Sequence, residues 1–163
     1  MTNSLTDRHL GGSPNPPTLG DILRIRGEVG AKRTAMSFEG RDTSYAQMLA
    51  HAFQVARALE AGGLKPQDRI GILAKNSDDF FTLFIGATMV GVVLVPVNWR
   101  LSAREIEYIL RDAGVRILFA GPEFEGLARA ATAAMTHPPR IVGMEGAAGG
   151  FGQGAGFSFT DIM

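Results

Sequence analysis

Residues 69–97 read RIGILAKNSDDFFTLFIGATMVGVVLVPV, and this segment contains two apolar runs of different character. No residue from Phe80 through Trp99 is charged, and an uncharged run of about 20 residues is long enough to span a bilayer. The composition changes at Gly91, however. The residues before it include Phe, Leu, Ala, Thr and Met, whereas those that follow are mostly valine and include a proline. A helix ending at Gly91 and a strand following at once fit this change better than a single membrane helix.

A further apolar strand, residues 69–74, precedes that helix, so the order is strand, helix, strand. Asn76 and Ser77 followed by Asp78 and Asp79 are typical of a helix start, because carboxylates in the first turn face the positive end of the helix dipole. Parallel strands joined by such a crossover are buried on both faces and therefore read as unbroken apolar runs. The segment predicts one unit of a parallel sheet.

The same alternation continues toward the C-terminus. We expect a helix over residues 102–114, a strand at 115–120, a helix from 122 to about 135 and a strand at 140–144. Ser102 and Glu105 form a capping box at the start of the first of these helices, and Gly114 suits its end. Alternating strands and helices from residue 69 onward predict an α/β fold with an open, mostly parallel sheet and helices on both faces.

A β-hairpin is expected before this sheet. Residues 34–38 and 41–44 flank a two-residue loop that ends in Gly40, which suits a tight turn. Ser44 and Gln47 then form a second capping box, and apolar residues recur at helical spacing as far as residue 59. Upstream, Thr18 can cap a shorter helix that closes near residue 27 or 30. The hairpin is thus predicted to lie between two helices.

Composition excludes several classes of function. The chain has 163 residues, one domain's worth, with 16 basic and 16 acidic side chains and a formal net charge of zero. No whole-chain field would attract nucleic acid or an anionic membrane, so we expect no nucleic-acid partner. The change at Gly91 argues against a transmembrane segment. There is no cysteine, which excludes disulfides, cysteine-ligated zinc and thiol nucleophiles. The cytoplasm is the default location.

Two segments are expected to be flexible. Residues 1–17 are rich in Gly and Pro and have no apolar stretch typical of a secretory signal, so they are interpreted as a leader. Residues 143–156 form a glycine-rich loop, but their glycines alternate and match neither a dinucleotide nor a P-loop spacing. A surface loop or linker explains this second segment better than a phosphate cradle.

No catalytic or metal motif is found. His51 is expected on the solvated face of its helix, and His9 and His137 have no partner at a ligand or triad spacing. Asp78 and Asp79 are adjacent on a helix and diverge by about 100°, so their helix-start position explains them without acid–base catalysis. We therefore assign no catalytic residue and no metal ligand.

Four short sequence motifs, in this order along the chain, resemble those of the adenylate-forming AMP-binding family. The motifs are Thr43-Ser-Tyr-Ala-Gln-Met48, Gly63-Leu-Lys-Pro-Gln-Asp-Arg-Ile70, Asn76-Ser77, and Gly91-Val-Val-Leu-Val-Pro-Val-Asn-Trp-Arg-Leu101. Within the family, the sequence of residues 98–101 is most similar to that of fatty-acyl and related acyl-CoA synthetases. The resemblance is dense from Thr18 to about Gly121 and thins toward Met163. It implies that residues 18–163 are an incomplete N-terminal subdomain of the adenylate-forming fold.

The resemblance also implies a reaction in two halves. ATP with Mg²⁺ would activate a carboxylic acid as an acyl-adenylate, and coenzyme A would then displace AMP. The phosphate-binding loop, the acidic residues and the C-terminal lysine that such a reaction needs are absent from this sequence, so we expect the chain alone to be inactive and to hold none of these cofactors tightly. The sequence leaves open whether the protein forms a homodimer.

Asn98 and Arg100 are weak candidates for ligand contact, because they follow a buried strand at the edge where ligand crevices tend to lie. A turn-forming asparagine and a solvent-facing or ion-paired arginine explain them better than ligand contact does. Two other hypotheses stay open for the whole chain: a non-catalytic α/β interaction module, and a membrane anchor that uses residues 80–99 as its span.

Overall fold

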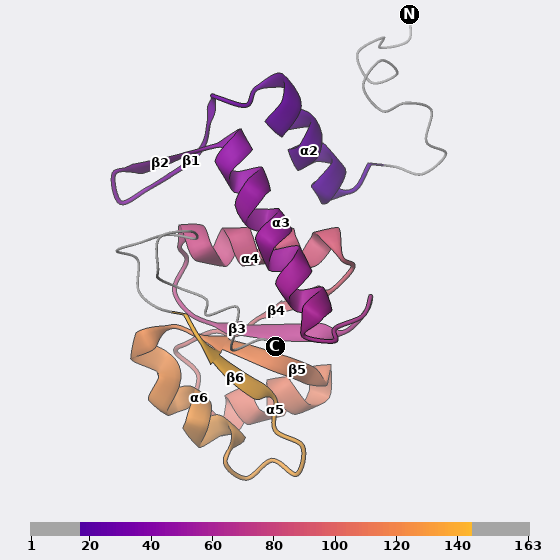
Figure 1. Ribbon diagram of the computed structural model, residues 1–163. Coiled ribbons are helices and arrows are strands. Elements are labelled where there is room, and N and C mark those ends of the chain that lie inside the picture. The colour runs from indigo at the N-terminus through magenta and orange to yellow at the C-terminus, as the bar shows by residue number, and fades with distance from the viewer. Residues whose placement is uncertain (1–16, 145–163) are drawn as a thin grey trace, which may run out of the picture.

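The computed structural model describes residues 17–144, which form a parallel four-stranded sheet between two layers of helices, with a hairpin and one further helix outside (Figure 1). In chain order the elements are α2 (Leu19–Val29), β1 (Thr34–Phe38), β2 (Arg41–Ser44), α3 (Tyr45–Ala61), β3 (Arg69–Leu73), α4 (Asp78–Met89), β4 (Val93–Pro96), α5 (Ala103–Ala113), β5 (Val115–Ala120), the 3₁₀ turn η1 (Pro122–Phe124), α6 (Glu125–Thr132) and β6 (Arg140–Gly143). The predicted α/β class, parallel sheet and preceding hairpin are confirmed.

The predicted change from helix to strand at Gly91 is confirmed. Helix α4 ends with Val90 as its C-cap, Gly91 turns the chain at a φ of +69°, and β4 begins two residues later. Across residues 17–144, none of the helices combines the length and apolar character that crossing a membrane requires. The uncharged run is therefore divided between a helix and a strand.

The predicted helix caps are also confirmed. Thr18, Ser44 and Ser102 each cap a helix, and in each case the third helical residue bonds back to complete a capping box. A side chain that satisfies an otherwise unpaired N–H at a helix start stabilises the helix by about 1 kcal/mol. These three boxes fix the first residues of α2, α3 and α5.

The sheet has the strand order β4-β3-β5-β6, and all its pairs are parallel. The chain leaves β3 through α4 toward β4, then crosses back over β3 through α5 to reach β5. Two apolar clusters separate the faces. One joins α3 and α4 to Ile70, Ile72 and Phe119, and the other joins α5 and α6 to Leu73 and Leu118. The loops after β3 and β5 therefore lead to opposite faces of the sheet (Figure 1).

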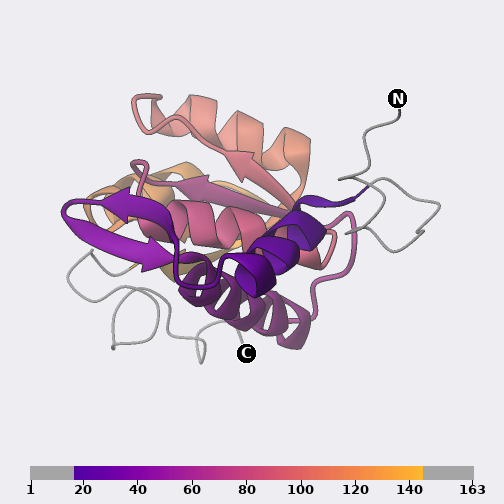
Figure 2. The same ribbon diagram turned by 90° about the horizontal axis from the view of Figure 1, so that it is seen from above.

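Helices α3 and α4 approach each other closely at Gly86. A Cβ atom there would lie 2.5 Å from the side chain of Val55 on α3, nearer than real Cβ contacts allow. Outside this pair, α2 packs on α3 and α4 through a third cluster around Leu23, Met48 and Ile85. Figure 2, seen from above, shows the hairpin and α2 beside α3.

Three details of the sequence analysis were wrong. The helix expected from 122 to about 135 is a 3₁₀ turn followed by the shorter α6, because Phe124 N–H bonds to the carbonyl of Gly121, three residues back. Strand β4 was expected to be buried on both faces. It is instead an edge strand of the described sheet, and its Val93 is 40% exposed. His51 is half-buried rather than fully solvated, and its burial lowers its pKa.

Candidate functional site

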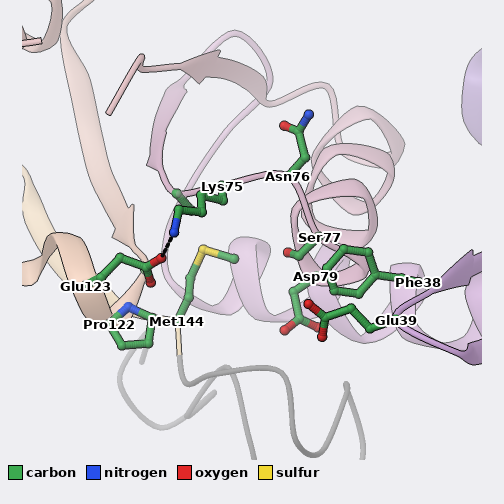
Figure 3. A pocket seen from close by; sticks show the side chains of 11 residues that line it. Phe38, Glu39, Lys75, Asn76, Ser77, Asp79, Pro122, Glu123 and Met144 are labelled. Atoms are coloured by element: carbon green, nitrogen blue, oxygen red, sulfur yellow. Dashed lines mark ion pairs between the residues drawn. The ribbon is translucent and has the colours of Figure 1, made fainter. Parts of the chain in front are cut away.

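A pocket of about 280 Å³ lies at the carboxyl ends of β3 and β5, between the two loops that lead to opposite faces of the sheet. Such a switch point is where open α/β sheets bind ligands. The lining residues come from the hairpin loop, the segment after β3, the turn after β5 and the end of β6: Phe38, Glu39, Ala74, Lys75, Asn76, Ser77, Asp79, Gly121, Pro122, Glu123 and Met144 (Figure 3). The fold therefore creates a candidate site by topology.

One side of this pocket is the first turn of α4, where three backbone donors are already used. The Ser77 hydroxyl accepts the N–H of Phe80 at 3.1 Å, and the N–H of Asp79 bonds to Asp78 Oδ1 at 3.2 Å. The N–H of Phe81 bonds to the carbonyl of Ser77. Although a helix N-terminus can attract anions, this one presents capped donors and two carboxylates.

The opposite side of the pocket carries an ion pair. Lys75 Nζ lies 3.0 Å from Glu123 Oε1, and Figure 3 shows the pair joining the segment after β3 to the turn after β5. The hydrogen bond from Lys75 lowers the pKa of Glu123. The ammonium group also lies 5.8 Å from the ring centre of Trp99 and 6.0 Å from that of Phe124. Lys75 is thus held by a carboxylate and two aromatic rings.

Adjacent carboxylates on α4 have different partners. Asp78 is 8% exposed and accepts a hydrogen bond from Arg41 of β2 at 2.9 Å, which ties the hairpin to the start of α4. Asp79 is 6% exposed and lines the pocket instead. Burial, reinforced by the nearby charge of Asp78 and only partly offset by Arg41, raises the pKa of Asp79 to about 6. Asp78 therefore forms an ion pair with Arg41, whereas Asp79 interacts with the same guanidinium only through its charge.

The balance of charge makes the pocket suited to a cation rather than an anion. Its lining includes three carboxylates, Glu39, Asp79 and Glu123, against one basic side chain, Lys75. Within residues 17–144, no cluster of three or more His, Cys, Asp or Glu side chains could hold a metal ion. A pocket of this charge would repel a polyphosphate.

Asn98 and Arg100, the two weak candidates from sequence, lie outside this pocket. Asn98 is exposed and organises a turn: its Oδ1 accepts the N–H of Arg100 at 3.0 Å and its carbonyl accepts that of Leu101. The guanidinium of Arg100 covers the ring of Trp99, 4.1 Å from its centre. The turn-forming interpretation describes Asn98 in this structure, and Arg100 stacks on an aromatic ring.

Sequence reasoning missed Lys75, Asp79 and Glu123 as members of one pocket. Each follows a predicted strand by a few residues, at the carboxyl edge where ligand sites gather. Applying that rule to all the strand ends, not only to the one before Asn98, would have selected them. The strand order needed to bring these ends together was not available from the sequence.

Comparison with known proteins shows the family. Residues 23–147, more than half of the chain, match the family described as AMP-binding enzyme. The chain belongs to this family. The relatives of this AMP-binding chain include a fatty acid–[acyl-carrier-protein] ligase, ScoC, from Streptomyces coeruleorubidus, 44% identical over 55% of the chain and 17% of the relative. Long-chain-fatty-acid–CoA ligase FadD13 from Mycobacterium tuberculosis is 39% identical over 63% of the chain and 21% of its own length.

Solved structures of AMP-binding ligases share the fold. The N-terminal domain of FACL13 from Mycobacterium tuberculosis superposes with a TM-score of 0.72 at 34% identity, covering 78% of this chain and 34% of that one. The anthranilate CoA ligase AuaEII, solved with anthranoyl-AMP, gives 0.74 at 30% identity over 80% of this chain and 25% of its own. The AMP-binding chain spans about a fifth of the length of the curated relatives named above.

Proposed function

We propose that this chain forms part of an ATP-dependent acid–thiol ligase, which converts a carboxylic acid into an acyl-adenylate and then into a thioester of coenzyme A. The family match over residues 23–147 carries the proposal. The two relatives named as fatty-acid ligases make a fatty acid the favoured substrate. Residues 18–163 would belong to the N-terminal AMP-binding domain of this enzyme, in the cytoplasm.

The pocket at the switch point does not fit the phosphates of ATP or their Mg²⁺. Two of its helix donors are capped by side chains, three carboxylates line it, and its lysine is paired with Glu123. Preorganised donors and cations are what phosphoryl chemistry requires. We therefore assign this pocket no role in the reaction. We expect the chain alone to catalyse no ATP–pyrophosphate exchange. Exchange that survives repurification and depends on an added fatty acid would contradict this expectation.

A chimera tests the ligase assignment directly. Residues 23–147 of this chain would replace the matching segment of FadD13, and acyl-CoA formation from a long-chain fatty acid would be measured. Since the chain shares the fold and 39% identity over the aligned part, we expect a folded, active enzyme. A shorter graft of residues 69–143, the parallel sheet, is the second variant. Folded chimeras without activity would leave the non-catalytic interaction module as the better account.

An acyl carrier protein is the second candidate acceptor, favoured by the 44% identity to ScoC. The same graft placed into ScoC would distinguish the two acceptors. Activity retained in the ScoC background and lost in the FadD13 background would favour a carrier protein, and the reverse result would favour coenzyme A.

A further inference from the structure

A second pocket, of about 240 Å³, lies where α2 ends and the chain turns into the hairpin (Figure 1). Its lining residues come from the last turn of α2, from the loop that follows, and from the first residues of β1 and α3: Arg26, Val29, Gly30, Arg33, Thr34 and Tyr45. None of these residues is acidic, whereas two are arginines. This pocket therefore differs in charge from the one at the carboxyl ends of β3 and β5.

Backbone hydrogen bonds hold the loop of this arginine pocket against α3. Within the loop, the N–H of Arg33 donates to the carbonyl of Gly30 at 2.8 Å. The carbonyl of Arg33 accepts the N–H of Tyr45, the first residue of α3, at 3.0 Å. The carbonyl of Ala31 accepts the N–H of Ala46 at 3.1 Å. The backbone that carries Arg33 is thus fixed relative to both helices.

The guanidinium groups of Arg26 and Arg33 have no acidic partner among residues 17–144. The acidic side chains of α2 interact with a different arginine: Asp21 lies 3.8 Å and Glu28 lies 3.4 Å from Arg24. The arginine pocket therefore carries two positive charges that the described part of the chain does not neutralise.

The ends of the two helices use little of this charge. A helix C-terminus carries about half a negative elementary charge, which Arg26, in the last turn of α2, is placed to offset. The first turn of α3, which bonds to the same loop, contributes a partial charge of the opposite sign. The two partial charges nearly cancel, so the arginines leave an excess of positive charge for a ligand.

We propose that the arginine pocket binds a phosphate group. Besides the two guanidiniums, the hydroxyl groups of Thr34 and Tyr45 line the pocket and can donate hydrogen bonds. Donors from four separate positions suit a tetrahedral anion with several acceptor oxygens better than a planar carboxylate, which one arginine can bind alone. At about 240 Å³, the pocket is smaller than most small-molecule sites, so it fits a phosphate group rather than a whole nucleotide.

This inference does not depend on the ligase assignment, because its test is a binding measurement on the 163-residue chain itself. The ¹⁵N-labelled chain would be titrated at pH 7.5 and constant ionic strength with sodium phosphate, with glycerol 2-phosphate and, separately, with sodium acetate. Backbone amide signals of Gly30, Thr34 and Tyr45 report on the pocket.

We expect saturable shifts with phosphate and none with acetate. Arg26→Gln and Arg33→Gln should each weaken phosphate binding about fivefold or more, since each removes a charged hydrogen-bond donor. The matched control, Arg24→Gln, removes the same charge from α2 at a position outside the pocket and should leave binding unchanged. All three arginines are exposed, so we expect the variants to fold, and their amide spectra check this.

Saturable shifts with glycerol 2-phosphate would show that the site accepts a phosphate ester, and shifts with inorganic phosphate alone would restrict it to the free anion. The proposal is overturned if neither phosphate compound gives saturable shifts, or if acetate shifts the same signals with the same midpoint. It is also overturned if either pocket variant binds phosphate as tightly as the parent chain, or if Arg24→Gln weakens binding as much as the pocket variants do.

Discussion

Replacing Asp79 with asparagine should stabilise the folded chain at neutral pH and leave its stability almost unchanged in acid. Burial raises the pKa of Asp79 from 3.8 to about 6, so the folded state binds this proton more tightly than the unfolded chain does. A raised carboxyl pKa means that the contribution of this group to stability is complete below pH 4 and is lost as the pH rises to about 6. Asparagine resembles the protonated acid and does not ionise.

The magnitude follows from the size of the shift. A change of about two pKa units, at about 1.4 kcal/mol per unit, makes ionisation of Asp79 cost about 3 kcal/mol in the folded state. The free energy of unfolding of Asp79→Asn, relative to the parent, should therefore increase by up to about 3 kcal/mol between pH 4 and pH 7.5. Most of that increase should occur below pH 6.5.

Urea denaturation followed by circular dichroism at pH 4, 5, 6 and 7.5 measures this difference. Comparing variant with parent at each pH removes the opposite slope of His51, whose lowered pKa makes stability rise with pH. The matched control is Asp112→Asn, which changes an exposed carboxylate on α5. A flat difference for Asp79→Asn, or a destabilised variant at pH 7.5, would refute the conclusion that burial raises the pKa of Asp79.

Three further substitutions test the packing. Gly86→Val should destabilise the chain by about 2 kcal/mol or more, because its side chain would collide with Val55 and separate α3 from α4, and urea denaturation would measure the loss. Ser102→Ala should cost about 1 kcal/mol and return the pKa of Glu105 toward its usual value, which carboxyl NMR titration would detect. Leu94→Asp, on a half-buried edge strand, should lower the thermal midpoint; an unchanged midpoint would mean that this side chain does not pack against α4.

Local signals in the sequence predicted most of the elements. Ser44 with Gln47 and Ser102 with Glu105 specify helix starts through bonds between residues three apart, so no distant contact is needed to recognise them. The hairpin turn is equally local, since Glu39 and Gly40 both adopt positive φ. The end of α6 was misplaced because the Thr132 hydroxyl bonds back to the carbonyl of Ala128 and a turn follows, a competition that helical spacing does not reveal.

The pocket depended on contacts between residues far apart in the chain. Lys75 and Glu123 are 3.0 Å apart in space only because β3 and β5 are neighbours, and Asp78 meets Arg41 only because the hairpin folds onto α4. From the sequence, Glu39, Lys75 and Glu123 are ordinary surface residues and Asp79 is an ordinary acid at a helix start. The burial of Asp79, and hence its raised pKa, arises from packing.

By itself, the sequence determined the alternation of strands and helices, the caps and the family resemblance, because each of these depends on nearest neighbours or on periodicity along the chain. Only the tertiary structure decided the strand order β4-β3-β5-β6 and with it the site. Reversing direction after β4 sends the loops that follow β3 and β5 to opposite faces, opens a pocket between them and leaves Asp79 mostly buried at its edge. That outcome depends on which strands pair, a long-range choice that the hydrophobic pattern of each strand leaves open.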